Sequence, residues 1–256
     1  MLKEMQITES GITEIDKVQI AINRIVGFND IALSKSPKGF YVGVSGGKDS
    51  TVLEYLYYLA QQQYPKLAYT LNHNHTTMDA PETVYFVRKM QKFWRAKGVE
   101  YYINKPMYKG KPTSIYKLIE DKGLPTRFRR WCCEILKETG GKGLCCSFGV
   151  RWQESTKRRN RGVYEIITKD IKEKVIRNND NDDTRQVFET CQKYNKYALN
   201  PIIDWSDSDV WEFIRLYKLE YNPLYDQGYT RVGCVGCPLS SHMASEFNKY
   251  PKITAN

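Results

Sequence analysis

Hydrophobic residues recur along this chain in two ways, as short continuous runs and as longer stretches with helical spacing. The continuous runs are rich in β-branched and aromatic residues, so they predict buried strands over residues 38–44, 66–71, 99–103 and 144–150. The helical spacing predicts helices over residues 13–34, 51–60, 81–96, 130–138 and 206–216. Because these strands alternate with helices, the pattern predicts an α/β fold with a doubly wound, mostly parallel sheet and helices on both faces.

Local signals mark the ends of three of these helices. Pro81 stands in the first turn of one, where its missing N–H costs nothing. Glycines 140–141 end another, and Ser206 or Asp207 is the expected N-cap of the last. The polar run 177–183 predicts a loop.

No internal repeat or low-complexity linker divides the chain. The simplest division is an N-terminal helical arm (1–36), a nucleotide-binding α/β domain (37–215) and a cysteine-bearing tail packed on the core (216–256). We see no apolar stretch of the ~18–20 residues needed to cross a bilayer, and no apolar secretory segment at the N-terminus. We therefore expect a cytoplasmic protein without a membrane partner.

The charge balance changes the list of expected partners. Over 256 residues the formal net charge is +10, which favours polyanions such as nucleic acid or nucleotide phosphates. The densest basic cluster comprises Lys157, Arg158, Arg159 and Arg161, and it suits either a nucleic-acid contact or a solvated loop.

The glycine-rich segment Ser45-Gly46-Gly47-Lys48-Asp49-Ser50 joins a buried strand to a helix. Backbone N–H groups of such a turn form a concave anion site, and the helix N-terminus adds partial positive charge. Gly46 and Gly47 allow close approach, Lys48 supplies a cation, and Ser45 and Ser50 supply hydroxyl groups. The spacing is not that of a Walker A loop. The pattern predicts a phosphate-binding loop.

Two arginines add to this expected anion site. Arg151 follows the fourth strand, and Arg130 precedes a pair of cysteines. Ligands of open α/β sheets bind at the carboxyl ends of the strands, where planar guanidinium groups match phosphate and sulfate.

The loop resembles the pyrophosphate-binding (PP) loop of the adenine nucleotide α-hydrolase superfamily. More narrowly, the chain is similar to the phosphoadenosine phosphosulfate (PAPS) reductase family. Further segments carry this resemblance in family order: Pro81–Thr83, Arg130–Cys133 with Lys137, Gly149–Arg151 with Glu154 and Ser155, Asn200–Trp205 with Asp209–Trp211, and Gly233–Pro238. The resemblance implies nucleotide binding by the six loop residues, Arg130 and Arg151, with Lys48, Asp49 and Arg151 in catalytic roles.

Seven cysteines in a chain expected in the cytoplasm argue for metal binding, catalysis or burial rather than disulfides. Cys234 and Cys237 form a Cys-x-x-Cys pair, which can hold a metal, a cluster or a redox disulfide. Cys132 and Cys133 are adjacent far upstream. The resemblance to iron–sulfur adenylyl-sulfate reductases implies that the two pairs together hold a [4Fe–4S] cluster. Zinc is the alternative.

The other cysteines and the histidines have weaker signals. Cys191 is a fifth candidate ligand, or else a buried thiol. Cys145 and Cys146 lie in an apolar strand and are expected in the core. The histidines lack metal spacing on a helix; we expect them at the surface, although His73 and His75 follow a strand end that could line a nucleotide pocket.

Three functions fit these features. The first is an ATP pyrophosphatase that uses ATP with Mg²⁺ to adenylate an acceptor, with nucleic acid as the candidate acceptor and a cysteine desulfurase as candidate sulfur donor. The second is an adenylyl-sulfate or phosphoadenylyl-sulfate reductase that forms sulfite with thioredoxin. Reductases of this family carry a nucleophilic cysteine near the C-terminus, whereas residues 239–256 contain none, so we favour the first. The third is a non-catalytic, nucleotide-sensing iron–sulfur protein.

Overall fold

The computed structural model describes residues 2–8, 11–156, 158–167, 176–177, 196–240 and 242–254. The chain forms two compact units, and each is described separately. The first unit comprises Met1–Gly43, Lys48–Leu71 and Gly141–Glu220. The second comprises Val44–Gly47, Asn72–Gly140 and Tyr221–Asn256. Two of the places where the chain passes from one unit to the other are the strand Tyr69–Asn74 and the glycine-rich loop.

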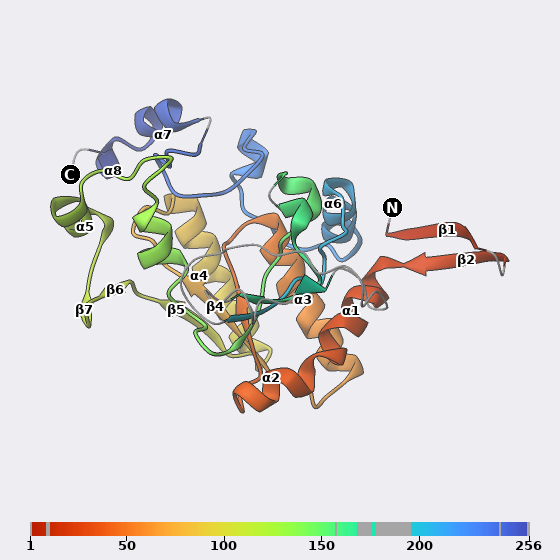
Figure 1. The fold of residues 1–256 in the computed structure, drawn as a ribbon. Coiled ribbons are helices and arrows are strands. Elements are labelled where there is room, and N and C mark those ends of the chain that lie inside the picture. Colours follow the sequence, from red (N-terminus) through yellow and green to blue (C-terminus); the bar gives the residue numbers. More distant parts are fainter. Residues whose placement is uncertain are drawn as a thin grey trace. The chain divides into compact units, whose positions relative to one another are not determined.

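The first unit contains most of the sheet (Figure 1). Its strands lie in the order β10-β9-β11-β8-β3-β4. Their bounds are β3 Phe40–Gly43, β4 Tyr69–Asn74, β8 Cys145–Ser147, β9 Tyr164–Ile167, β10 Ile176–Arg177 and β11 Lys196–Leu199. Strands β11, β8 and β3 are parallel, whereas β9 pairs antiparallel with β11, and the edge strand β10 pairs antiparallel with β9. The predicted α/β class with a mostly parallel sheet is confirmed.

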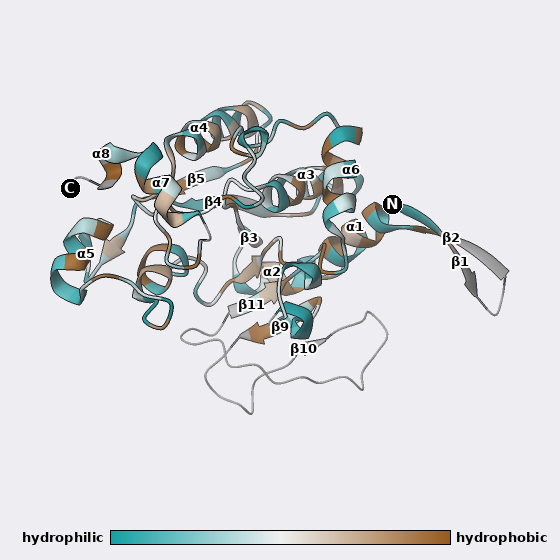
Figure 2. Ribbon diagram, turned by 90° about the horizontal axis from the view of Figure 1, so that it is seen from above, coloured by the Kyte–Doolittle hydropathy of each residue, from teal (hydrophilic) through white to brown (hydrophobic). Residues whose placement is uncertain are grey.

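Four helices complete the first unit: α1 Lys17–Gly27, α2 Asn29–Lys35, α3 Lys48–Gln63 and α6 Asp207–Leu216. Helix α3 packs against both α1 and α6. Hydrophobic and hydrophilic residues alternate around α1, as expected for a helix with one buried face (Figure 2). Short 3₁₀ turns cover Trp152–Glu154 and Arg158–Asn160.

The N-terminus differs from the prediction of one helix over residues 13–34. An antiparallel hairpin, β1 (Lys3–Thr8) with β2 (Gly11–Asp16), precedes α1 and projects from its start (Figure 1). Asp16 ends the hairpin and caps α1, because its carboxylate accepts hydrogen bonds from the N–H groups of Val18 and Gln19. The prediction was therefore wrong for residues 13–16, and Phe28 separates α1 from α2.

The second unit contains β5, the neighbour of β4 in the sheet, and a mainly helical remainder. Its elements are α4 Pro81–Ala96, β5 Tyr101–Asn104, β6 Met107–Tyr108, β7 Lys111–Pro112, α5 Ile115–Lys122, a π-helical turn Cys133–Lys137, a 3₁₀ turn Tyr225–Gln227, α7 Met243–Lys249 and α8 Pro251–Thr254. Helix α4 has the predicted bounds, with Pro81 at its first position. The helix expected over residues 130–138 is instead centred on the wider π turn.

All four predicted strands begin and end at other residues than expected, and two of these differences affect the candidate site. Strand β4 starts and ends three residues later than the predicted 66–71, so it includes His73. Strand β8 ends at Ser147 rather than at residue 150, which leaves 148–150 as a connection to Arg151. The three-part division at residues 36 and 215 stays a prediction. Across the described residues, none of the helices has the length and apolar character to cross a membrane.

Candidate functional site

The glycine-rich turn is held tightly within the second unit. Gly46 has a φ of 79°, a backbone conformation that favours glycine. A Cβ at this position would lie 3.0 Å from the methyl groups of both Thr83 and Val87 on α4. Asn222, which is fully buried, donates hydrogen bonds to the Gly46 carbonyl (3.1 Å) and to the Thr83 hydroxyl (3.0 Å). The turn is thus fixed against α4 by contacts that leave no room for a side chain.

The rest of the loop leads directly into α3. The Gly47 N–H donates to the Ser45 hydroxyl (3.3 Å), and α3 begins at the next residue, Lys48. The positive end of the helix dipole therefore lies at the loop, as phosphate binding requires.

We expect Gly46→Ala to lower the free energy of unfolding by about 1–2 kcal/mol, because alanine is strained at positive φ and its methyl group would press on α4. Urea denaturation would measure this change. The matched control is Gly27→Ala at the end of α1, where a Cβ meets nothing within 4 Å. Equal stability of the two variants would show that the turn is not constrained.

A network of two cations and two carboxylates lies in the first unit, at the start of α3. Arg151 donates from Nε to Asp49 (2.6 Å) and from a terminal nitrogen to Asp207 (2.9 Å). Lys48 Nζ lies 3.0 Å from the same Asp207 oxygen and 3.7 Å from Asp49. Both cationic side chains are buried, whereas the Asp207 side chain is about half exposed. The three predicted catalytic residues, Lys48, Asp49 and Arg151, thus meet in one network.

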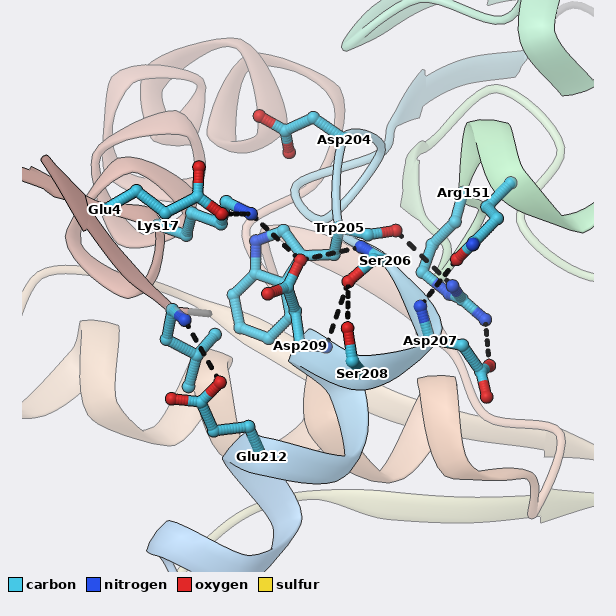
Figure 3. Close-up of polar contacts among 12 residues, drawn as sticks. Glu4, Lys17, Arg151, Asp204, Trp205, Ser206, Asp207, Ser208, Asp209 and Glu212 are labelled. Atoms are coloured by element: carbon cyan, nitrogen blue, oxygen red, sulfur yellow. Dashed lines mark hydrogen bonds and ion pairs between the residues drawn. The ribbon is translucent and has the colours of Figure 1, made fainter. Parts of the chain in front are cut away.

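The position of Asp207 is set by the turn that precedes α6. Arg24 of α1 holds this turn through a bidentate pair with Asp204 (2.8 and 3.0 Å) and a hydrogen bond to the Pro201 carbonyl. Arg151 donates a third hydrogen bond to the Trp205 carbonyl (3.3 Å), as Figure 3 shows. The turn therefore presents its backbone and Asp207 to Arg151.

Helix α6 begins with a reciprocal cap (Figure 3). The Ser206 hydroxyl accepts from the Asp209 N–H (3.1 Å), and the Asp209 carboxylate accepts from the Ser206 N–H (2.8 Å). Lys17 also bridges Asp209 (3.0 Å) and Glu4 of β1 (2.8 Å). Ser206 is thus the N-cap, one of the two residues expected from the sequence, and the first turn of α6 is fixed on both sides.

The charge of Asp207 is set by its two cationic neighbours. Burial alone would raise the pKa of Asp207, but the ammonium of Lys48 and the guanidinium of Arg151 outweigh it and lower that pKa. Asp207 is therefore ionised at neutral pH.

Gly149 allows the segment before Arg151 to approach α3, because a Cβ on this residue would lie 2.9 Å from the Asp49 carbonyl oxygen.

The second unit contains both predicted cysteine pairs. Cys132 and Cys133 lie at the start of the π turn, and the Cys-x-x-Cys pair lies in a tight turn in which the Cys237 N–H donates to the Cys234 carbonyl (3.3 Å). Cys132 interacts electrostatically with Cys234, and Cys234 with Cys237. The six described cysteines are all free thiols. The fold therefore brings the two distant pairs into one region.

Two cationic residues accompany these thiols. A hydrogen bond from Cys132 lowers the pKa of the Cys133 thiol, and Arg130 lowers it further by donating to the sulfur (3.3 Å). Burial alone would lower the pKa of Lys137, but attraction to Cys234, Asp79 and Cys133 outweighs burial and raises that pKa. Positive charge beside the sulfurs stabilises thiolates, the form that binds metals. Arg130, expected as a nucleotide ligand, thus contacts a thiol here, and its nucleotide role stays a prediction.

The histidines at the end of β4 differ from expectation. His73 is 4% exposed, so the expected surface position is wrong for this residue. Its Nδ1 lies 2.9 Å from the Val44 carbonyl, immediately before the loop. His75 Nδ1 lies 3.0 Å from an Asp79 carboxylate oxygen. The three-residue shift of β4 explains the burial, because it carries His73 into the sheet.

The remaining predicted residues have varied outcomes. Cys145 and Cys146 are fully buried in β8, as expected for core thiols. Cys191 and Lys157 lie outside the described residues. Within the basic cluster, Arg158 pairs with Glu154, and Arg161 with Glu165. The Arg158 and Arg161 side chains are thus partly neutralised by acids.

Sequence reasoning did not identify two residues that take part in these contacts, Asp207 and Asn222. Asp207 was considered only as a helix cap, and Asn222 was not considered at all. Their positions follow from contacts distant in sequence, so no spacing could have revealed their partners.

Comparisons with known proteins agree with this architecture. The phosphoadenosine phosphosulfate reductase domain model matches residues 40–240. An uncharacterized protein of Methanocaldococcus jannaschii is 29% identical over 213 residues, covering 82% of this chain and 44% of that protein. The chain spans less than half the length of the first curated relatives that it matches.

Two solved structures have a similar fold. A phosphoadenylyl-sulfate (PAPS) reductase from Candida auris, in a phosphate complex, has a TM-score of 0.51 at 16% identity and covers 90% of this chain and 96% of its own. The U34-tRNA thiolase NcsA from Methanococcus maripaludis, with its [4Fe–4S] cluster, has a TM-score of 0.50 at 15% identity and covers 98% of this chain and 79% of its own. At these identities the likeness concerns the fold alone.

Proposed function

Because the chain belongs to the phosphoadenosine phosphosulfate reductase domain family, a family of nucleotide-binding proteins, we propose that it is an ATP pyrophosphatase. In this proposal the protein binds ATP with Mg²⁺, adenylates an acceptor and releases pyrophosphate. The adenylated acceptor then receives sulfur. The observation that carries the proposal is the pair of buried cations, Lys48 and Arg151, arranged around two carboxylates where the glycine-rich loop enters α3.

The reaction needs charge neutralisation more than a protein nucleophile. An acceptor oxygen attacks the α-phosphorus, the bond from that phosphorus to the bridging oxygen breaks, and pyrophosphate leaves with the electron pair. The acceptor proton passes to solvent. The loop amides and Lys48 would stabilise the negative charge that builds up on the leaving group. Asp207, half exposed and ionised, offers the carboxylate oxygen that Mg²⁺ prefers.

The described thiols of the first unit do not suit a direct attack on a sulfonate. Cys145 and Cys146 are both fully buried in β8. Burial raises the pKa of Cys145 to about 12, so this thiol stays protonated at neutral pH. A protonated core thiol is a poor nucleophile, so Cys145 is not expected to attack a sulfonate.

The thiols of the second unit fit a metal or a cluster by the chemistry of their donors. Burial raises the pKa of Cys234, whereas Cys132 and Arg130 lower that of Cys133. A bound metal displaces the remaining thiol protons, so four cysteines in two pairs can supply four thiolates. We propose that Cys132, Cys133, Cys234 and Cys237 hold a [4Fe–4S] cluster, with zinc as the alternative. A cluster with each iron held by one of these thiolates would supply electron-transfer chemistry for the sulfur step. The sulfur donor in this proposal is a persulfide-forming protein of the cysteine desulfurase class.

Nucleic acid is the acceptor class that we propose. The net charge of +10 favours a polyanionic partner, and an acceptor oxygen or base carbonyl can be adenylated and then exchanged for sulfur. The fold shared with a tRNA thiolase agrees with this class.

The decisive experiment measures pyrophosphate from ATP and Mg²⁺, with and without transfer RNA and DNA fragments. We expect Lys48→Ala to reduce release by about 10²–10³-fold, because it removes a cation aimed at the leaving phosphates. The matched control is Lys66→Ala, an exposed lysine after α3 that should leave the rate unchanged. Sulfite formation from adenylyl sulfate and thioredoxin, without pyrophosphate release from ATP, would contradict the proposal. Nucleotide binding without turnover would indicate a sensor.

A further inference from the structure

A compact group of nitrogen and oxygen ligands lies in the second unit. It lies close to Cys234, whose backbone pairs with that of Asp79 and whose thiol donates to the Thr76 hydroxyl (3.5 Å). Ligand atoms of His73, His75 and Asp79 all lie within 4.8 Å of one another. Among the described residues, this is the only set of three or more His, Cys, Asp or Glu residues that meets this distance. We propose that these three residues bind a first-row divalent transition-metal ion.

The distances between ligand atoms suit one ion. Two ligands at about 2.1 Å from a metal, in tetrahedral or octahedral geometry, lie roughly 3.0–3.4 Å apart. His75 Nδ1 and the Asp79 oxygen are 3.0 Å apart, and His73 Nε2 is 4.0 Å from the same oxygen. A small rotation of the His73 ring would complete the site.

Hydrogen bonds orient the ligand atoms in the way that metal sites require. A carbonyl oxygen only accepts, so Val44 fixes a proton on Nδ1 of His73 and leaves the Nε2 lone pair turned toward Asp79. The Thr76 N–H donates to the Asp79 carboxylate (2.8 Å). Outer hydrogen bonds of this kind fix the tautomer of a ligand histidine and the orientation of a ligand carboxylate.

Two of the three side chains are buried, and the third is partly exposed to solvent. His73 and Asp79 are 4% and 7% exposed, whereas His75 is 32% exposed. The site is therefore enclosed on one side and reached by solvent on the other. A bound ion would keep coordination positions for water or an anionic ligand.

The donor set indicates the class of ion. Two imidazoles and one carboxylate suit zinc, iron(II) or cobalt(II), whereas Mg²⁺ prefers oxygen ligands alone. The donor set thus differs from the one that Mg²⁺ prefers, and binding at this site needs no turnover of ATP. Lys137 also lies near Asp79, but it shares its charge with Cys133 and Cys234.

Cobalt(II) is the probe that separates this site from the thiols. Thiolate ligands give Co²⁺ intense charge-transfer absorption in the near ultraviolet, whereas nitrogen and oxygen ligands give only weak visible bands. We expect the full chain, with its cysteine site already filled, to bind one further Co²⁺ per chain with weak visible bands alone. His75→Ala and Asp79→Asn should each weaken this binding by at least about 10–100-fold.

Two variants keep the test informative if a substitution disturbs folding. His75 is partly exposed and Asp79→Asn preserves shape, so thermal unfolding of both should stay close to that of the parent chain. His242→Ala, an exposed histidine outside the group, should keep full cobalt binding. Absence of the additional Co²⁺, equal binding by His75→Ala, or a charge-transfer band lost in Cys234→Ala would each overturn the proposal. Pyrophosphate release plays no part in this readout.

Discussion

Replacing Arg151 with alanine is expected to abolish pyrophosphate release and to lower the free energy of unfolding by about 3–5 kcal/mol. Arg151 is 2% exposed and donates to Asp49, Asp207 and the Trp205 carbonyl. Its removal takes one cation away from two carboxylates and one hydrogen-bond donor away from a buried carbonyl. Removing one partner of a buried ion pair is strongly destabilising because the charge of the other partner is left uncompensated. Urea denaturation and the pyrophosphate assay measure the two effects.

The lysine variant separates charge from geometry at this position. Arg151→Lys keeps the cation but cannot reach two carboxylates and a carbonyl with a planar fork. We expect it to recover part of the stability and little of the activity. The control is Arg215→Ala, an exposed arginine in the last turn of α6. If Arg151→Ala unfolds at the same urea concentration as this control, the network does not stabilise the unit.

The second large effect is expected for Cys234. Cys234→Ala removes one of four proposed thiolates, so protein purified without oxygen should lose most of its bound iron and the accompanying visible absorbance. Sulfur transfer to the acceptor should fall below detection. Elemental analysis and absorption spectra measure the metal, and mass spectrometry of the acceptor measures the sulfur.

Cys145→Ala is the matched control for this experiment. Cys145 is fully buried in the core strand β8 of the first unit and belongs to neither proposed ligand pair. This variant should therefore retain the metal of the parent chain. Stoichiometric zinc without iron would show that the cysteines hold zinc and not a cluster. Equal metal content in both variants would show that the Cys-x-x-Cys pair is not a ligand.

Elements with local end signals were predicted well from the sequence. Helix α4 has the predicted bounds because Pro81 fixes its first turn, and α6 begins where the Ser206 cap indicated. The N-terminal helix was misplaced because Ile15 happens to continue the helical spacing of α1 backwards into β2. Asp16 caps the helix after that residue, and hairpin pairing decides the conformation before it.

The candidate site could be predicted only as far as its motifs are local. The loop residues and Arg151 were recognisable from short segments. Asp207 and Asn222 were not, because their partners lie far away in sequence: Asn222 contacts Gly46, and Asp207 contacts Lys48. His73 was misassigned because β4 lies three residues further along the chain than predicted, and strand ends are weakly encoded in sequence.

The π turn at Cys133–Lys137 has a further consequence. Its closing hydrogen bond runs from the Glu138 N–H to the Cys133 carbonyl (2.9 Å), one residue wider than an α-helix requires. Such a turn corresponds to a single inserted residue, and it persists in proteins mainly at functional sites. Here the additional residue rotates the side chains that follow it by about a quarter turn around the helix axis. The ammonium group of Lys137 reaches the sulfur of Cys234 from a backbone that a regular helix would have aimed elsewhere.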